Sequence, residues 1–218
     1  MTVKNQRAEL ILKILNEIYP EIPIPLKHRN IYELLISVLL SAQCTDDRVN
    51  KVTPILFAKA NSPVKMCEIS IETIYNIIRP CGLGPKKSKA ISELSNILVK
   101  KFKCVVPKTY EELEALPGVG HKTASIVMSQ GFGYSAFPVD THIHRLAQRW
   151  GLTSGKSVKQ TERDLKKIFP EASWNKLHLQ MIFYGREFCT ARNCNGLECK
   201  ICTICFPRRH KPIKTKKA

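Results

Sequence analysis

The chain has 218 residues, 44% of them hydrophobic, a length that fits one or two ordinary domains with a sizeable core. It carries 35 Lys and Arg residues against 18 Asp and Glu residues, and the net charge of +17 suits a polyanionic partner without separating DNA from RNA or an anionic membrane surface. The sequence has no apolar run long enough for a membrane span and no signal peptide, so a membrane protein is excluded and a soluble, cytoplasmic one is expected.

The hydrophobic pattern predicts helices along almost the whole chain. The nearly all-apolar stretch at residues 32–40 is typical of a central buried helix, which ends at 41–43. Thr109-Tyr-Glu-Glu112 has the form of a capping box and predicts a short helix. Further helices are expected to begin at Val139 and after Ser157. The other predicted helices span residues 10–18, 49–60, 71–78, 88–99 and, as the last one, 175–184. Because no alternating strand of convincing length is present, the predicted fold class is all-α.

The most informative motif is Leu116-Pro-Gly-Val-Gly-His-Lys-Thr-Ala124, a glycine-rich turn followed at once by a helical pattern. Gly118 and Gly120 allow a tight turn and a close approach of the backbone to a ligand. The unpaired N–H groups at the start of the following helix suit a phosphate. Lys122 would lie on the first helical turn beside that phosphate, where partial desolvation favours a nucleophilic amine.

Asp140, in the segment Val139-Asp-Thr-His-Ile-His144, is the second candidate for chemistry. Its carboxylate could take the proton of Lys122 or stabilise a developing cation. A helix start with a surface lysine is the simpler reading of a lone Gly-x-Gly. The hairpin, the lysine and the downstream Val-Asp-Thr-His occur together here, and that combination favours an active site.

The nine cysteines predict a metal centre, because disulfides are rare inside cells. Cys44, Cys67, Cys81 and Cys104 are scattered in apolar surroundings, and we interpret them as small buried hydrophobic residues. Five others crowd the C-terminal region: Cys189, Cys194, Cys199, Cys202 and Cys205. Spacing alone does not decide between zinc and an iron–sulfur cluster.

These motifs resemble the helix-hairpin-helix DNA glycosylase superfamily, specifically its endonuclease III branch, and the resemblance runs from Leu34 to Cys205. It implies that Gly118, Val119 and Gly120 contact the DNA backbone. It also implies that the lysine at Lys122 attacks the sugar C1′ and that the aspartate at Asp140 assists.

Two further segments match the same family. Ser41-Ala-Gln-Cys-Thr-Asp46 resembles the segment whose glutamine fills the gap left by a flipped nucleotide, which makes Gln43 the candidate. Gly82-Leu83 resembles the loop whose leucine wedges into the duplex. The sequence after Leu83 is longer and more basic than the family pattern, so additional phosphate contacts are expected. His142 is interpreted as a DNA-contacting residue and His144 as a structural one.

The resemblance implies two helical domains flanking a DNA-binding cleft, with Lys122 on one wall and Asp140 near the other. A six-helix domain with the hairpin would span residues 23–134, and residues 1–22 with 135–218 would form a cluster-bearing domain. The basic tail, residues 207–218, is interpreted as a disordered arm that raises nonspecific, salt-dependent affinity for DNA.

For the metal centre, the resemblance implies a [4Fe-4S] cluster, but the cysteine spacings depart from the family's C-x6-C-x2-C-x5-C. The outer pair keeps the family's overall span, and Cys199, Cys202 and Cys205 form a C-x2-C-x2-C run. The favoured ligand set is therefore Cys189 with that run, and Cys194 is a spare or a substitute for Cys202. Zinc remains the alternative metal.

The implied function is a bifunctional DNA glycosylase and AP lyase of base excision repair. It would remove oxidised pyrimidines such as thymine glycol from double-stranded DNA and cleave abasic sites through a lysine Schiff base and β-elimination. The expected protein is a monomer without a membrane partner. One alternative is an adenine glycosylase, which lacks a lysine nucleophile and carries an added C-terminal domain. The other is a non-catalytic iron–sulfur DNA-binding protein, in which Lys122 or Asp140 would be lost.

Overall fold

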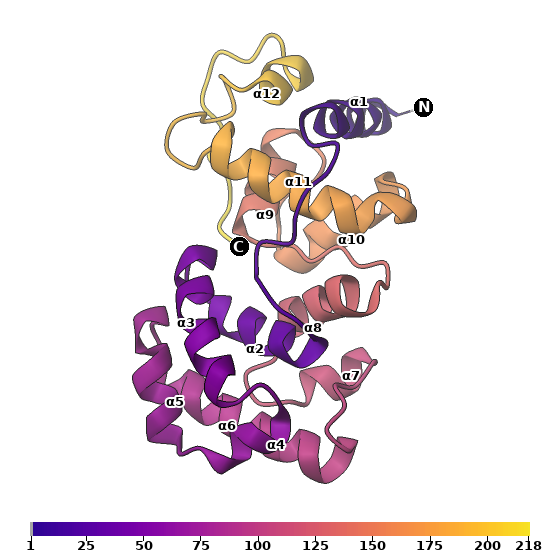
Figure 1. The fold of residues 1–218 in the computed structure, drawn as a ribbon. Helices are drawn as coiled ribbons and strands as arrows, with labels where there is room; N and C mark the ends of the chain where they lie inside the picture. The colour runs from indigo at the N-terminus through magenta and orange to yellow at the C-terminus, as the bar shows by residue number, and fades with distance from the viewer. Residues whose placement is uncertain (1) are drawn as a thin grey trace. The chain divides into compact units, whose positions relative to one another are not determined.

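The computed structural model describes residues 2–218 as α-helices joined by short loops, without a β-strand in that range (Figure 1). The predicted all-α fold is confirmed. The chain forms two compact units: Ile24–Tyr134 is one, and Ser135–Ala218 together with the N-terminal segment ending at Pro23 is the other. Within residues 2–218, no helix combines the length and apolar character that a bilayer span requires.

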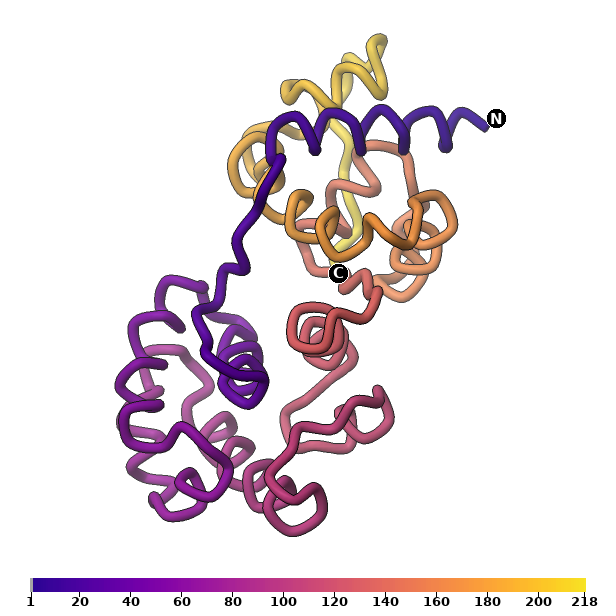
Figure 2. Tube along the Cα trace, turned by 45° about the vertical axis from the view of Figure 1, so that its right-hand side comes forward, coloured from indigo at the N-terminus to yellow at the C-terminus, as the bar shows by residue number. Residues whose placement is uncertain are grey.

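The unit Ile24–Tyr134 is built around one buried helix. Residues 32–40 of this helix are all buried, as the apolar run predicted, and the helix packs against four neighbouring segments. Figure 2 shows residues 19–30 entering this unit as a non-helical segment. The helical elements are α2 (Ile31–Ser41), α3 (Asp46–Lys59), α4 (Pro63–Glu68), α5 (Ile71–Ile78), η1 (Arg79–Cys81), α6 (Gly84–Phe102), α7 (Tyr110–Glu114), α8 (His121–Ile126) and the π-helical η2 (Val127–Gly131).

Side-chain caps explain where several of these helices begin. Thr109 accepts a hydrogen bond from the backbone N–H of Glu112 (3.3 Å), and its hydroxyl donates to the Glu112 carboxylate (2.7 Å). Thr109 is therefore the N-cap of α7, as predicted, but the Glu112 carboxylate accepts from its hydroxyl rather than from the backbone N–H of the capping-box pattern. Asn30 and Ser70 cap α2 and α5 in the same way through their side-chain oxygens.

The second unit joins the first helix of the chain to the C-terminal helices. Its elements are α1 (Val3–Ile18), α9 (Thr141–Arg149), α10 (Val158–Ile168), η3 (Glu171–Ser173), α11 (Trp174–Glu187) and α12 (Lys200–Cys205). α11 packs against α1 and α9. The largest buried side chains of this unit include Trp150, Phe137 and Tyr184. The Gln180 side chain donates to the carbonyls of Leu15 (3.2 Å) and Tyr19 (2.9 Å), so a buried amide holds the C-terminal end of α1.

The structure adds one helix to the predicted set and corrects two predictions of local structure. The added helix is α4, which begins at Pro63, because the fixed φ and missing N–H of proline are tolerated in a first helical turn. The helix at 175–184 is not the last, because α12 follows it. The helix predicted from Val139 begins at Thr141, since the Asp140 side chain forms the N-cap.

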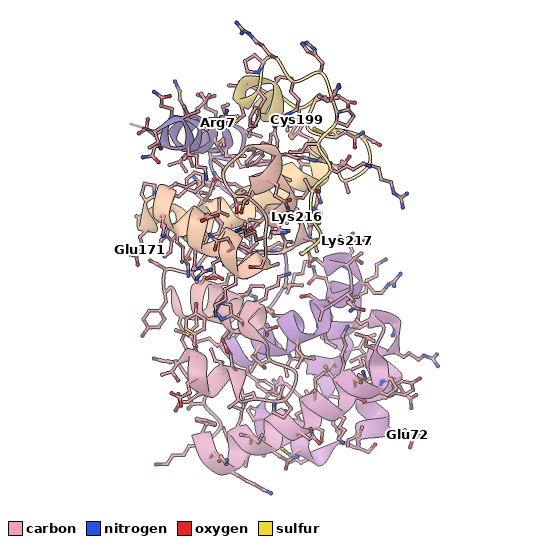
Figure 3. The ribbon with its side chains drawn as sticks, turned by 180° about the vertical axis from the view of Figure 1, so that it is seen from behind. Arg7, Glu72, Glu171, Cys199, Lys216 and Lys217 are labelled. Atoms are coloured by element: carbon pink, nitrogen blue, oxygen red, sulfur yellow. The ribbon has the colours of Figure 1, made fainter. Side chains whose placement is uncertain are left out.

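The basic tail is also ordered against its own unit, which contradicts the expected disordered arm. The Gln148 side chain accepts a hydrogen bond from the backbone N–H of Lys216 (2.8 Å) and donates to the Lys216 carbonyl (3.1 Å). The Ile213 backbone N–H donates to the Asn195 carbonyl (3.1 Å). Figure 3 labels Lys216 and Lys217 near the C-terminal end of the chain. The Gln148 side chain thus holds the tail backbone at Lys216 through two hydrogen bonds. Charge composition alone does not predict such contacts.

Candidate active site and cysteine centre

The glycine hairpin lies between α7 and α8 and is anchored by two buried apolar residues. Leu116 is 2% exposed and Val119 is 6% exposed, and both pack into the core of Ile24–Tyr134. Gly118 has φ +78°, and a Cβ there would lie 3.0 Å from side-chain atoms of Leu39 and Ala90. A Cβ at Gly120 would meet no atom within 4 Å. The first glycine is therefore needed for the turn, and the second leaves open space in front of the backbone.

Lys122 lies on the first turn of α8, next to this open space. Gly120 is the N-cap of α8, and no side chain of the described residues caps it. The first N–H groups of a helix have no intrahelical partner, so this end suits an anion. The Lys122 side chain is exposed. That differs from the partial desolvation expected from the sequence, because the position faces away from the core that Ala124 enters.

Gln43 and Leu83, the two residues implicated in entering the duplex, share an unusual backbone conformation. Gln43 has φ +55° in the loop between α2 and α3, and Leu83 has φ +51° at the N-cap of α6. Gln43 is exposed, and the Leu83 side chain is 46% exposed. The left-handed region is costly for residues with a Cβ, so surrounding contacts must hold both loops.

Asp140 is half-buried at the N-terminal end of α9, in the second unit. Its Oδ1 accepts a hydrogen bond from the backbone N–H of Ile143 (2.8 Å), so one oxygen is used as a helix cap. His142, two residues after Asp140 on the first turn of α9, is partly buried, and desolvation lowers the pKa of its imidazole. His144 is buried, and its Nδ1 lies 2.8 Å from the Thr161 hydroxyl, in agreement with a structural role.

Four buried cysteines meet at one point in the second unit. The sulfur atoms of Cys189, Cys194, Cys199 and Cys202 all lie within 4.8 Å of one another. This set differs in one member from the predicted one: Cys194 takes part, and Cys205 lies outside the group. The left-handed residues Asn195 (φ +47°) and Gly196 (φ +83°) form a tight turn that brings Cys194 back to the other three.

Cys205 has different surroundings. It is the last residue of α12, three positions after Cys202, and burial raises the pKa of its thiol to about 11. The nearby cationic side chains of Arg7 and Arg209 oppose that increase. Both guanidinium groups lie over the Phe206 ring, at 4.0 Å and 3.8 Å from its centre, and Figure 3 labels Arg7 and Cys199 in this unit.

A buried arginine indicates that the four-cysteine group suits an anionic metal centre. The Arg149 residue is 2% exposed, and its Nη1 donates to the Cys189 sulfur (3.3 Å) and the Thr190 carbonyl (2.7 Å). No carboxylate in the described part of the chain forms an ion pair with Arg149. Burying a cation without an anion is expensive, and a cluster of thiolates bound to metal would supply the missing negative charge.

The sequence predicted that the four scattered cysteines are all buried, and the structure shows that only one of them is. Cys81 is buried, Cys44 and Cys67 are partly buried, and Cys104 is exposed. Cys104 follows the left-handed C-cap of α6 and has φ +65° itself, which turns it out of the core. These four therefore do not behave as one class of core residue.

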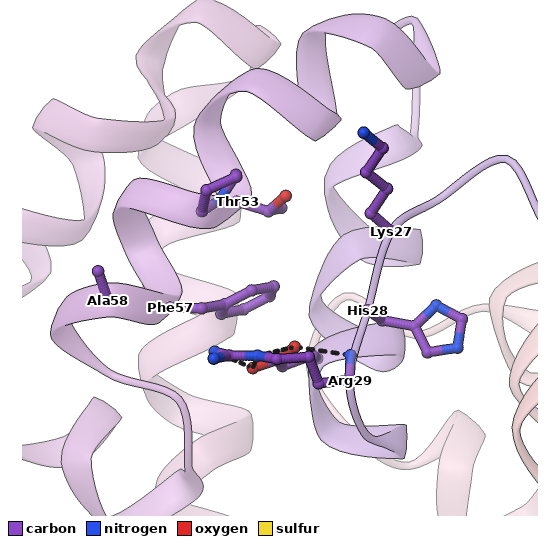
Figure 4. A pocket seen from close by; sticks show the side chains of 8 residues that line it. Lys27, His28, Arg29, Thr53, Phe57 and Ala58 are labelled. Atoms are coloured by element: carbon purple, nitrogen blue, oxygen red, sulfur yellow. Dashed lines mark hydrogen bonds and ion pairs between the residues drawn. The ribbon is translucent and has the colours of Figure 1, made fainter.

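One pocket of the Ile24–Tyr134 unit contains none of the predicted site residues. It has a volume of about 380 Å³, and Lys27, His28, Arg29 and Phe57 are among the residues that line it (Figure 4). The Arg29 guanidinium pairs with the buried Glu33 carboxylate at 2.7 Å. The charge of Arg29 at this pocket is thus already neutralised by Glu33. Lys122 and Asp140 do not line the pocket.

Two buried cations near the candidate sites, Lys87 and Arg149, were not predicted from the sequence. Lys87 falls on the apolar stripe of α6 that continues through Ile91, Leu94 and Leu98, and a lysine at such a position was a readable signal. Arg149 lies at the end of α9, and its sequence neighbours give no comparable signal, because its partners lie about 40 residues away.

Comparisons with known proteins agree on one family. A family model described as "HhH-GPD superfamily base excision DNA repair protein" matches residues 36–171. Endonuclease III of Synechocystis sp. is 39% identical over 94% of this chain and 94% of its own length. The solved structure of a non-covalent endonuclease III–DNA complex is 39% identical, with a TM-score of 0.88, and covers 94% of this chain and 96% of that one. A trapped covalent endonuclease III–DNA intermediate is 40% identical, with a TM-score of 0.86 over 92% and 94% of the two chains.

Proposed function

The chain belongs to the endonuclease III family of the HhH-GPD superfamily, and from this membership we infer that it is a bifunctional DNA glycosylase and AP lyase of base excision repair. Its substrates are oxidised pyrimidines and abasic sites in double-stranded DNA. The observation that carries the inference is the exposed amine of Lys122 on the first turn of α8, directly after an uncapped glycine hairpin.

In this proposal, catalysis begins when the damaged nucleotide leaves the base stack, since its C1′ is inaccessible inside a duplex. The neutral Lys122 amine attacks C1′, the bond between C1′ and the base breaks, and the base departs with the bonding electrons and takes up a proton. The Asp140 carboxylate stabilises positive charge that develops on the sugar. Loss of the amine proton and opening of the sugar give a Schiff base between Lys122 and C1′.

The Schiff base makes the 2′-proton acidic. Its removal lets the 3′-phosphate leave by β-elimination, which breaks the strand on the 3′ side of the lesion. Hydrolysis of the remaining imine then frees Lys122 for the next turnover. In the same proposal, the backbone at Gly118, Val119 and Gly120 binds a DNA phosphate, because a helix start presents several N–H donors to one anion.

Gln43 and Leu83 are proposed to occupy the space that the flipped nucleotide vacates. Their exposure and their position on short loops support this role. His142 is proposed as a further DNA contact close to Asp140. Lys86 and Lys89, the exposed basic residues after Leu83, are proposed as phosphate contacts, whereas Lys87 is buried and does not fit the expected phosphate contact. Salt-dependent binding is the expected property of such contacts.

The cysteine centre is proposed to hold a [4Fe-4S] cluster through Cys189, Cys194, Cys199 and Cys202. Their common burial, their mutual distances and the buried Arg149, whose guanidinium donates to the Cys189 sulfur, support this assignment. When bound, the cluster would cross-link the C-terminal loop and hold its basic residues in place. Four thiolates also suit zinc, so iron analysis and the visible absorption spectrum of the purified protein decide between the metals.

Borohydride trapping on an abasic duplex tests the proposed enzyme directly. We expect a covalent protein–DNA adduct with the wild-type protein and none with Lys122→Gln, because reduction fixes only a Schiff base. Lys59→Gln removes the same charge from an exposed position on α3 and is the matched control. DNA affinity should change by less than about threefold in both variants, since the hairpin contacts come from the backbone.

The alternatives give different results in the same assay. An adenine glycosylase would remove its base without an adduct, and a non-catalytic DNA-binding protein would bind the duplex and leave it intact. If Lys122→Gln still cleaved thymine-glycol DNA at the wild-type rate, Lys122 would not be the nucleophile.

A further inference from the structure

Lys87 makes three hydrogen bonds from one buried ammonium group. It lies on the first turn of α6 and is 5% exposed. Its Nζ donates to the backbone carbonyls of Leu40 (2.8 Å), Ala42 (2.7 Å) and Cys81 (3.0 Å). A lysine ammonium has three protons, so these contacts use its full donor capacity. No carboxylate among the described residues pairs with it, and all three hydrogen-bond acceptors of its ammonium are backbone carbonyls.

The three carbonyls lie at the C-terminal ends of α2 and η1, directly before the loop residues Gln43 and Leu83. The Ala42 carbonyl is part of the peptide bond that leads into Gln43, and Leu40 precedes it at the C-terminal end of α2. The Cys81 carbonyl lies two residues before Leu83. In addition, the backbone N–H of Lys87 donates to the Leu83 carbonyl (3.0 Å). One residue therefore connects both loops, which are 40 residues apart in the sequence.

Both loops need such support because of their backbone conformation. Gln43 and Leu83 have φ values of +55° and +51°, a left-handed region that is sterically unfavourable for a residue with a Cβ. A residue in this region keeps its conformation only when the surroundings determine it. A cation is also favourable at the end of α2, where unpaired carbonyls carry partial negative charge. Lys87 thus links the backbone beside both strained residues through a single side chain.

We propose that Lys87 is a positioning residue that holds Gln43 and Leu83 in a fixed relation, so that both enter the duplex together. The inference rests on the proposed function, in which these two residues fill the space of the flipped nucleotide. It adds a residue that touches neither DNA nor the reacting atoms. Its effect should appear only with substrates whose bases must be separated from a duplex.

Two substrates separate this role from the chemistry. Duplex DNA with thymine glycol needs base flipping, whereas single-stranded DNA with an abasic site needs only the Lys122 reaction. Lys87→Met keeps most of the side-chain length and removes the donors. We expect its single-turnover rate to fall about 10- to 100-fold on the duplex, as for a misplacement near 1 Å, and to stay within about twofold on the single strand.

Lys65→Met, at an exposed position on α4, loses the same charge and should match the wild type on both substrates. The fluorescence of a 2-aminopurine base beside the lesion reports loss of base stacking. It should rise when the wild type or the control binds, but not when Lys87→Met binds. In a Gln43→Ala, Leu83→Ala background, adding Lys87→Met should change the duplex rate by less than about twofold, because residues acting through one step are not additive.

The possible outcomes distinguish this inference from the proposed function. A wild-type protein without activity on either substrate would overturn the proposed function and the inference with it. If the wild type is active and Lys87→Met shows equal losses on both substrates, or none, only the role of Lys87 is overturned. Lys87→Gln, which retains amide donors, should show the same preference with a smaller loss if the Met variant does not fold. If neither variant folded, Lys87 would be required for the stability of the fold, and the proposed positioning role would be overturned.

Discussion

Gly118 and Gly120 lie two residues apart in the hairpin, and we expect alanine at the two positions to damage different properties. Gly118 has φ +78°, so Gly118→Ala places a residue in the left-handed region at a cost of roughly 1–2 kcal/mol. The new Cβ would also lie 3.0 Å from Leu39 Cδ1 and Ala90 Cβ. Overpacking of this kind costs about 1–3 kcal/mol. The free energy of unfolding should therefore fall by about 2–5 kcal/mol in total.

Gly120→Ala should leave stability within about 0.5 kcal/mol of the wild type. Its φ of −98° is open to any residue, and a Cβ would meet no atom within 4 Å. The methyl group would instead occupy the space in which a phosphate approaches the backbone. Loss of one charge-assisted hydrogen bond is worth about 1.5–3 kcal/mol, which corresponds to roughly 10- to 100-fold weaker DNA binding.

Thermal unfolding and fluorescence anisotropy measure the two effects separately. For a chain of this size, 2–5 kcal/mol lowers the unfolding midpoint by roughly 4–20 °C, so Gly118→Ala should be clearly resolved and Gly120→Ala should not. Binding is measured to a duplex with a non-cleavable abasic analogue, at a temperature where both variants are folded. A stable Gly118→Ala protein would refute the steric argument, and wild-type affinity of Gly120→Ala would refute the phosphate contact.

Two further substitutions test the second unit. Asp140→Asn should retain stability, because asparagine caps helices as well as aspartate, while single-turnover base removal falls more than DNA affinity does; equal losses would leave Asp140 as an ordinary cap. Cys194→Ser should give an iron-poor protein without visible absorption, whereas Cys205→Ser should keep both, and the reverse pattern would favour the ligand set first read from the sequence.

Features set by neighbouring residues in the chain could be predicted from sequence. The N-cap at Thr109 and the buried helix at residues 32–40 depend on local spacing, and both are present. The hairpin could be identified for the same reason, since its glycines and the apolar Leu116 and Val119 stand within five residues. Short helices were harder: α4 and α12 have six residues each, too few to show a periodic pattern.

The cysteine centre shows where spacing stops being informative. Five cysteines within 17 residues allow several sets of four, and each set satisfies some ligand spacing. The choice depends on the path of the loop. Asn195 and Gly196 reverse the chain after Cys194, and the Arg209 guanidinium donates to the Gly196 carbonyl (2.9 Å). A turn held by a residue 13 positions away cannot be read from the cysteine pattern.

The partners of the buried cations Lys87 and Arg149 likewise cannot be read from the sequence. Each donates to backbone carbonyls from distant segments, and neither has a carboxylate partner in the described chain. Complementary charges in the sequence therefore give no hint of their partners. This difference also decides what their loss would do. A salt bridge can be removed as a pair, but the carbonyls around Lys87 belong to the backbone, and those of Leu40 and Cys81 stay buried when the cation is lost. The cost of removing Lys87 must then appear as movement of the loops that carry those carbonyls.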